Sequence, residues 1–224
     1  MSVFEKLKSM KLVTTYGNFT ILFLIFCLLV IIPFFPSVIH RALYISVFTI
    51  LFFVTIFALS KYQKRFFSFA VVVILTEWAA YIIKMDILYD ISILMNIVFF
   101  IVVVILLIAQ LIRADKVSTL VILEAINGYL LLGIAYSLII ALISSIDPGA
   151  FGFTGHVTKG ISYQYDYFYY GFITYSTLGY GDISPLLPYS KGLSILITVS
   201  GQLYLAVIIA ALIGKYLSQP SKED

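Results

Sequence analysis

Charged residues and cysteine are scarce in this sequence. Only 11% of the 224 residues are charged and 62% are hydrophobic, whereas soluble domains carry roughly 25% charged residues. The mean hydropathy is +1.09, so the composition predicts a membrane protein. The single cysteine, Cys27, lies in an apolar run. It therefore excludes a disulfide within one chain and a metal site built on thiolates.

Motifs for catalysis and for cofactor binding are also missing from the sequence. It contains no catalytic nucleophile with a base, no cluster of metal-ligating side chains and no phosphate-binding loop. We therefore expect neither an enzyme nor a bound cofactor. The net charge of +3 is spread over short loops, so we expect no nucleic-acid partner, and lipids are the expected surroundings. A cleavable signal peptide is not evident either, and we interpret the first apolar run as an uncleaved span.

Long apolar runs, by contrast, are frequent. A membrane-spanning helix needs about 20 largely apolar residues. Six segments meet this requirement: 19–39, 42–60, 66–84, 91–112, 117–144 and 190–217. A seventh stretch, 166–176, is only half as long, so we expect a re-entrant helix there. The fold class is therefore predicted to be an all-α membrane protein.

The basic residues predict how the chain is oriented. With the N-terminus in the cytoplasm, the cytoplasmic side holds ten of the fourteen lysines and arginines, and the outer side holds Arg41, Lys84, Lys159 and Lys191. Because cytoplasmic loops are enriched in positive charge, both termini are expected inside and segment 145–189 outside.

The fourth span, 91–112, contains no lysine or arginine, and Arg113 follows only at its end. A voltage sensor needs several basic residues that move through the membrane field. We therefore expect no steep voltage dependence from this helix.

One short motif, Thr177-Leu178-Gly179-Tyr180-Gly181-Asp182, stands between the re-entrant stretch and the last span. A dehydrated cation needs a cage of oxygen dipoles, and successive backbone carbonyls can supply it only if they face one axis. Glycines at alternating positions accept the left-handed dihedrals that this requires. The motif thus predicts an ion filter, with Thr177 adding a hydroxyl at the inner mouth and Tyr180 packing against the preceding helix.

This hexapeptide resembles the signature of potassium channels, in which valine usually replaces Leu178. The resemblance implies potassium coordination by residues 177–181, in a pore formed by four identical chains. It extends upstream to a pore helix that carries Tyr169 and ends at Ser176, and downstream to Ile183-Ser184-Pro185. Where some bacterial channels place a glutamate behind the filter, this chain has Ile173. Asp182 is therefore expected either to accept a hydrogen bond from Tyr169 or to be a solvated carboxylate.

The last span resembles the inner helix of such channels. Gly201 occupies the place of their hinge glycine, although a close-packing glycine is the alternative. Ala206 and Ala210 continue a face of small residues that either forms a gate or packs against the fifth span. The stretch Gly201-Gln202-Leu203-Tyr204-Leu205-Ala206-Val207 also resembles a bacterial group of small ion-channel proteins, which favours a prokaryotic plasma membrane.

Three further residues are candidates for modulation. Glu77 lies at the middle of the third span, where a carboxylate is costly. Either a structural hydrogen bond, with Asn96 or a tyrosine, or a pH-sensitive role would explain it. Glu124 is expected to pair with Arg113, Lys116 or Asn127, with a gating role as the alternative. His156, in the outer loop, is either an acid sensor or simply solvated.

The sequence thus predicts three parts: a peripheral four-helix bundle (1–112), a pore domain (113–217) and a short tail (218–224). The expected function is passive, selective conduction of potassium, without any cofactor beyond the permeant ion. Two alternatives remain open, namely a weakly selective cation channel and a non-conducting subunit that regulates another channel.

Overall fold

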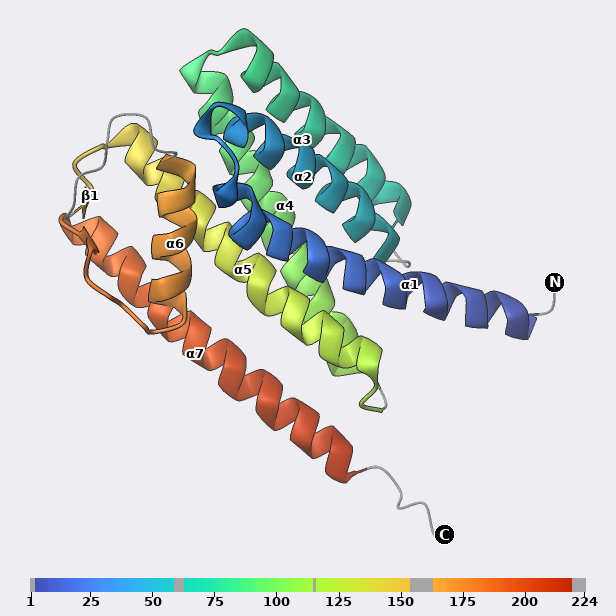
Figure 1. The fold of residues 1–224 in the computed structure, drawn as a ribbon. Coiled ribbons are helices and arrows are strands. Elements are labelled where there is room, and N and C mark those ends of the chain that lie inside the picture. Colours follow the sequence, from blue (N-terminus) through green and yellow to red (C-terminus); the bar gives the residue numbers. More distant parts are fainter. Residues whose placement is uncertain (1–2, 59–62, 115, 154–162, 219–224) are drawn as a thin grey trace.

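The computed structural model describes residues 3–58, 63–114, 116–153 and 163–218. Long helices dominate the described chain (Figure 1). The helices are α1 (Val3–Phe26), α2 (Ser37–Ala58), α3 (Gln63–Ile83), α4 (Asp86–Arg113), α5 (Thr119–Ile146), α6 (Tyr163–Tyr175) and α7 (Pro188–Leu217). A π-helical turn, η1 (Cys27–Ile31), and a 3₁₀ turn, η2 (Ile32–Phe34), follow α1 directly.

Six of these segments are long and apolar enough to cross a membrane: Thr14–Phe34, Ser37–Ile56, Phe66–Ile83, Asp86–Arg113, Thr119–Ile146 and Pro188–Leu217. The six predicted spans are therefore present. The short seventh stretch is also helical, as α6, with edges that differ from the predicted 166–176.

The predicted boundary between the first two spans is wrong. The first span ends at Phe34 rather than at residue 39, and α2 already begins at Ser37. Two prolines cause the shift. The ring of Pro33 lies in the 3₁₀ turn, and Phe35 is extended, with ψ of 162°, because a residue before proline disfavours the helical region. The chain thus turns at Phe35-Pro36, earlier than the apolar run suggests.

A small antiparallel sheet was not predicted. Strand β1 (Phe151–Phe153) pairs with β2 (Ile183–Pro185), with Gly152 opposite Ser184. The buried hydroxyl of Ser190 donates a 2.7 Å hydrogen bond to the carbonyl of Ala150, which fixes this sheet to the start of α7. The sheet thus joins the segment that follows α5 to the segment that precedes α7.

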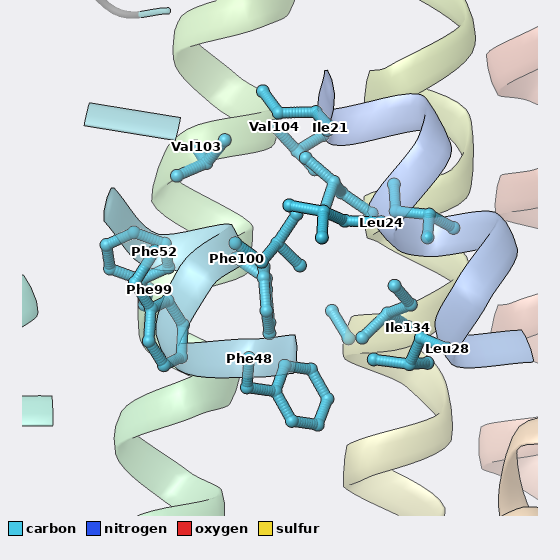
Figure 2. Close-up of a cluster of buried hydrophobic side chains, with 14 of the residues drawn as sticks. Ile21, Leu24, Leu28, Phe48, Phe52, Phe99, Phe100, Val103, Val104 and Ile134 are labelled. Atoms are coloured by element: carbon cyan, nitrogen blue, oxygen red, sulfur yellow. The ribbon is translucent and has the colours of Figure 1, made fainter. Parts of the chain in front are cut away.

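The main core joins helices that are distant in sequence. Figure 2 shows side chains from α1, α2, α4 and α5 meeting in one cluster. Aromatic rings form its centre: the ring centroids of Phe52 and Phe99 lie 4.6 Å apart, edge to face, and those of Phe48 and Phe100 lie 5.7 Å apart. Such pairs add to stability beyond the area that they bury. Helices α1 and α4 thus pack directly on α5, and side chains of α2 join the same cluster.

At the opposite edge, α7 contacts mainly α6 and α5, and Figure 1 shows it lying along one side of the molecule. Only 22% of its most apolar window is buried, against 50% for α4. Near its C-terminal end, the ammonium group of Lys215 donates hydrogen bonds to the carbonyls of Leu111, Ile112 and Ala114, at the end of α4. A cation there also suits the negative end of the helix dipole.

Two buried asparagines link α1 to α5. The side-chain amide of Asn127 donates 2.9 Å hydrogen bonds to both the backbone carbonyl and the side-chain oxygen of Asn18. The Asn18 amide in turn donates to the carbonyl of Thr14. Hydrogen bonds between helices inside a membrane are worth about 0.6 kcal/mol on average and about 1.7 at most.

We expect Asn18→Leu and Asn127→Leu each to lower the free energy of unfolding, and their effects to be less than additive by about 1 kcal/mol. Unfolding of the two single variants and the double variant in mixed micelles would measure this coupling. Strict additivity would show that the bridge contributes nothing to stability.

Candidate functional site

The segment Ser176–Asp182 follows the C-terminal end of α6 and has an unusual backbone. The φ angles of Thr177, Gly179 and Gly181 are 64°, 53° and 82°, whereas Leu178 and Tyr180 have ordinary negative φ. Positive and negative φ angles therefore alternate along the segment. This alternation turns successive peptide planes so that their carbonyls can face one side.

Thr177 is one of two non-glycine residues with positive φ in the described chain; the other is Lys84. Such a conformation costs on the order of 1–3 kcal/mol and persists only where the surroundings impose it. Hydrogen bonds to the end of α6 impose it here. The carbonyl of Ile173 accepts from the amides of Leu178 (2.8 Å) and Gly179 (3.0 Å), and that of Thr174 accepts from Thr177 (3.0 Å).

The outer surface of this segment is uncovered within the chain. The side chains of Leu178 and Tyr180 are 57% and 67% exposed, and a Cβ added to Gly179 or Gly181 would meet no atom within 4 Å. Tyr180 is therefore not buried against the preceding helix, although it lies close enough to Tyr169 of that helix to act on it electrostatically.

Tyr169 and Asp182 come together, as one of the two sequence interpretations expects. The Tyr169 hydroxyl donates a hydrogen bond to Asp182, and this bond raises the pKa of the tyrosine to about 12. Asp182 also accepts a 3.1 Å bond from the amide of Ile183. Burial, followed by the charge of Asp182, raises the pKa of Asp166 on the same helix. The Ser176 hydroxyl donates a weak 3.4 Å bond to the Ile173 carbonyl.

A group of tyrosines surrounds the C-terminal end of α6. The ring of Tyr175 is fully buried, with its centroid 4.5 Å from that of Tyr129 and 5.7 Å from that of Tyr136. Both partners lie on α5. On the other side, the Tyr170 hydroxyl lies 2.7 Å from that of Ser194 on α7. The short helix is therefore held between α5 and α7.

Two residues of α7 that the sequence interpretation missed also contact this region. The Thr198 hydroxyl donates a 3.3 Å bond to the Thr174 carbonyl, and the Gln202 amide donates a 3.4 Å bond to the Thr177 hydroxyl. Both are polar, they lie four residues apart, and they share one face of the helix. This spacing of two polar residues was visible in the sequence and could have identified them as candidate contacts of the segment.

Gly201, the predicted hinge, lies where α7 crosses α6. A Cβ there would come within 2.2 Å of the Tyr175 carbonyl oxygen and 2.9 Å of its ring. Helix α7 is continuous from Pro188 to Leu217, so it has no break at this glycine. The geometry favours the close-packing alternative. Ala206 and Ala210, the predicted gate residues, are exposed, so they do not pack against α5 within the chain.

The three candidate modulatory residues lie apart from this segment. Glu77 is buried in α3 and receives a hydrogen bond from Asn96, one of its expected partners. Glu124 is 5% exposed, but in the described parts of the chain neither Arg113, Lys116 nor Asn127 bonds to it; Asn127 bonds to Asn18 instead. That expected pairing is wrong. His156 lies outside the described residues.

Comparison with known proteins identifies the same region. Residues 149–219 match a protein-family model described as an ion channel. No curated protein and no solved structure matches the chain. The match spans β1, α6, the exposed segment and α7, and it supports an ion channel, which points away from an enzyme. Together with six apolar helices, it supports a channel with several membrane passes.

We expect Gly201→Ala to destabilise the protein, because the added methyl group would clash with the backbone of Tyr175, which cannot move without disturbing the exposed segment. Gly214→Ala is the matched control on the same helix, since nothing lies within 4 Å of its added Cβ. The control should be neutral, or stabilising by up to about 1 kcal/mol from helix propensity.

Thermal unfolding of the two variants and of the unmodified protein in detergent would measure the difference. Equal melting temperatures for the two variants would contradict the close-packing role of Gly201.

Proposed function

We propose that the chain is one subunit of a potassium-selective channel, in which four copies surround one axis and conduct K⁺ passively. The observation that carries this proposal is the alternating backbone of residues 177–181, held by the end of α6 and exposed on its other side. Rings of carbonyls from four such segments would replace the hydration shell of K⁺. Thr177, Leu178, Gly179, Tyr180 and Gly181 are the proposed coordinating residues.

The uncovered surfaces support assembly into a homotetramer. In one chain the coordinating segment is exposed, and α7 presents a long row of exposed apolar side chains that includes Ile195, Val199, Leu203 and Val207. Ala206 and Ala210 lie on uncovered parts of the same helix. Copies of this chain, with lipid around them, are the proposed partners that would cover these surfaces.

Electrostatics near the segment also favour a cation. Helix α6 ends at Tyr175, and the carbonyl end of a helix carries a partial negative charge. Tyr169 and Asp182 would brace the outer end of the filter, Ser176 would brace its inner end, and Gln202 would orient the Thr177 hydroxyl. Conduction would then require no cofactor besides the permeant ion. The proposed location is a plasma membrane, of prokaryotic type, with both termini in the cytoplasm.

Ion flux into liposomes tests the proposal. With purified protein, we expect flux under a K⁺ gradient to exceed flux under an equal Na⁺ gradient by about tenfold or more. Gly179→Ala should lower the K⁺ flux by about tenfold, because alanine disfavours the left-handed φ of 53° at that position.

Gly192→Ala is the matched control. An added Cβ there also meets nothing within 4 Å, and its φ is not in the left-handed region, so the K⁺ flux should be unchanged. Equal K⁺ and Na⁺ fluxes would instead indicate a weakly selective cation channel. A well-formed tetramer without flux would indicate a non-conducting subunit that regulates another channel.

A further inference from the structure

A small cavity lies between the peripheral helices and α5, at the end of the bundle that carries β1 and β2. Its volume is about 30 Å³, which is room for about two water molecules. Four polar side chains line it: Arg41 from α2, Glu77 from α3, and Tyr89 and Asn96 from α4. The rest of its wall is apolar. Nothing in the proposed conduction path uses these residues.

Two oxygen atoms in this cavity have no hydrogen-bond donor. Glu77 and Asn96 are only 7% and 3% exposed. The Asn96 amide hydrogen-bonds one side of the Glu77 carboxyl group, but Glu77 Oε2 and Asn96 Oδ1 are both buried without a partner. A buried acceptor without a hydrogen-bond donor costs free energy. A ligand that supplies a donor would therefore stabilise these two oxygens.

The charged and titratable groups around Glu77 do not provide that donor. The guanidinium of Arg41 is held instead over the rings of Tyr81 and Tyr89, at 5.6 and 5.5 Å from their centroids. Asp90, near Tyr89 on α4, accepts a hydrogen bond from Ser145 of α5. Tyr167 of α6 is close enough to Tyr89 to interact with it electrostatically. Within the described chain, Asn96 is thus the only hydrogen-bond partner of Glu77.

The ligand that fits this arrangement with the fewest further contacts is a proton. An ionised carboxylate without a cationic partner is strongly disfavoured in an apolar interior. A proton on Oε2 removes that charge and turns the atom into a donor for Asn96 Oδ1, so one hydrogen satisfies both oxygens. A sodium ion would instead need several oxygen ligands. The rest of the cavity wall does not offer them, because it is formed by apolar side chains such as Ile45 and Ile93.

We propose that Glu77 and Asn96 form a proton-binding site in the peripheral bundle, supplied from solution past the exposed Arg41. The Asn96 amide donates to one carboxyl oxygen of Glu77, and the bound proton closes the second bond in the opposite direction. Loss of this proton leaves a charged group that draws water into the cavity. The site therefore has two states, protonated and ionised.

The walls of the cavity also contact the pore helix α6. Phe48, which lines the cavity, has its ring centroid 6.3 Å from that of Phe168 on α6. Leu138 lines it from α5 and is adjacent to Ser137, whose Oγ lies 2.2 Å from where a Cβ on Gly171 of α6 would stand. One layer of side chains thus separates the proton site from the helix that supports residues 177–181. Proton binding would then change flux, and this effect alone rests on the proposed function.

Infrared spectroscopy of the whole protein in lipid tests the site directly, without reference to conduction. At neutral pH we expect a carboxylic-acid C=O band that Glu77→Gln lacks and Glu124→Gln, the matched buried carboxylate, keeps. Alkaline solution should remove the band. Asn96→Leu should shift it to higher frequency, because the acid would lose its acceptor. Replacing Na⁺ by choline at constant pH should leave it unchanged.

The proposal is overturned if the unmodified protein and Glu77→Gln have the same bands at every pH, or if Na⁺ removes the band at constant pH, which would assign the site to sodium. Flux then tests the coupling. We expect K⁺ flux to change about fivefold or more between neutral and alkaline pH in the unmodified protein but not in Glu77→Gln.

The two proposals fail separately. An infrared band without any flux at any pH would retain the proton site and reject the channel. Flux without the band would retain the channel and reject the proton site. An infrared band that Glu77→Gln lacks, together with a K⁺ flux whose pH profile is the same in both proteins, would retain the site and reject its link to α6.

Discussion

The close approach of α6 to α5 and α7 is the contact on which the rest of the site depends. The backbone of residues 177–179 bonds to carbonyls at the end of α6, so their conformation is only as well defined as the position of that helix. Side chains larger than glycine would prevent the approach at Gly171 and Gly201. The buried ring of Tyr175 then fills the space between the three helices. A strained residue such as Thr177 persists because this packing leaves it no alternative.

The uncovered surfaces follow from the same arrangement. Helix α6 is covered by α5 and α7. The segment that follows α6 is therefore exposed on the side away from these helices. An exposed segment of irregular backbone is poorly suited to lipid, where every polar backbone group needs a partner. The match of residues 149–219 to an ion channel family includes this segment.

The peripheral helices are joined to the pore region at two levels. Aromatic side chains connect α2 and α4 with α6, through Phe48, Phe100 and Phe168. At the other end, Lys215 ties α7 to the last carbonyls of α4. The fourth span carries no row of basic residues that a membrane field would move. It packs instead against α5, and its last carbonyls accept hydrogen bonds from Lys215 of α7.

Much of this architecture was predictable from the sequence. The length of the apolar runs determined the number of spans, because a bilayer requires about 20 apolar residues for each crossing. The glycines of Thr177–Asp182 determined the site, since only they accept its backbone readily. Sequence also suggested the contacts of Asp182 with Tyr169 and of Glu77 with Asn96, because costly carboxylates need a partner.

Other features were decided by the tertiary structure. The apolar runs do not show at which residue the chain turns between two spans. The two prolines therefore end the first span at Phe34, earlier than the apolar run predicts. The β1–β2 pair joins segments thirty residues apart, and three-residue strands carry no periodicity long enough to detect. Whether Gly201 acts as a hinge or as a close-packing residue depends on which residue lies against it in the fold. That residue is Tyr175. The sequence by itself determined that this chain crosses the membrane and carries a filter-like motif, because length and backbone freedom are local properties. Only the fold decided which of the possible polar partners meet, and it added pairs such as Asn18 with Asn127 and Thr177 with Gln202, because long-range packing selects those partners.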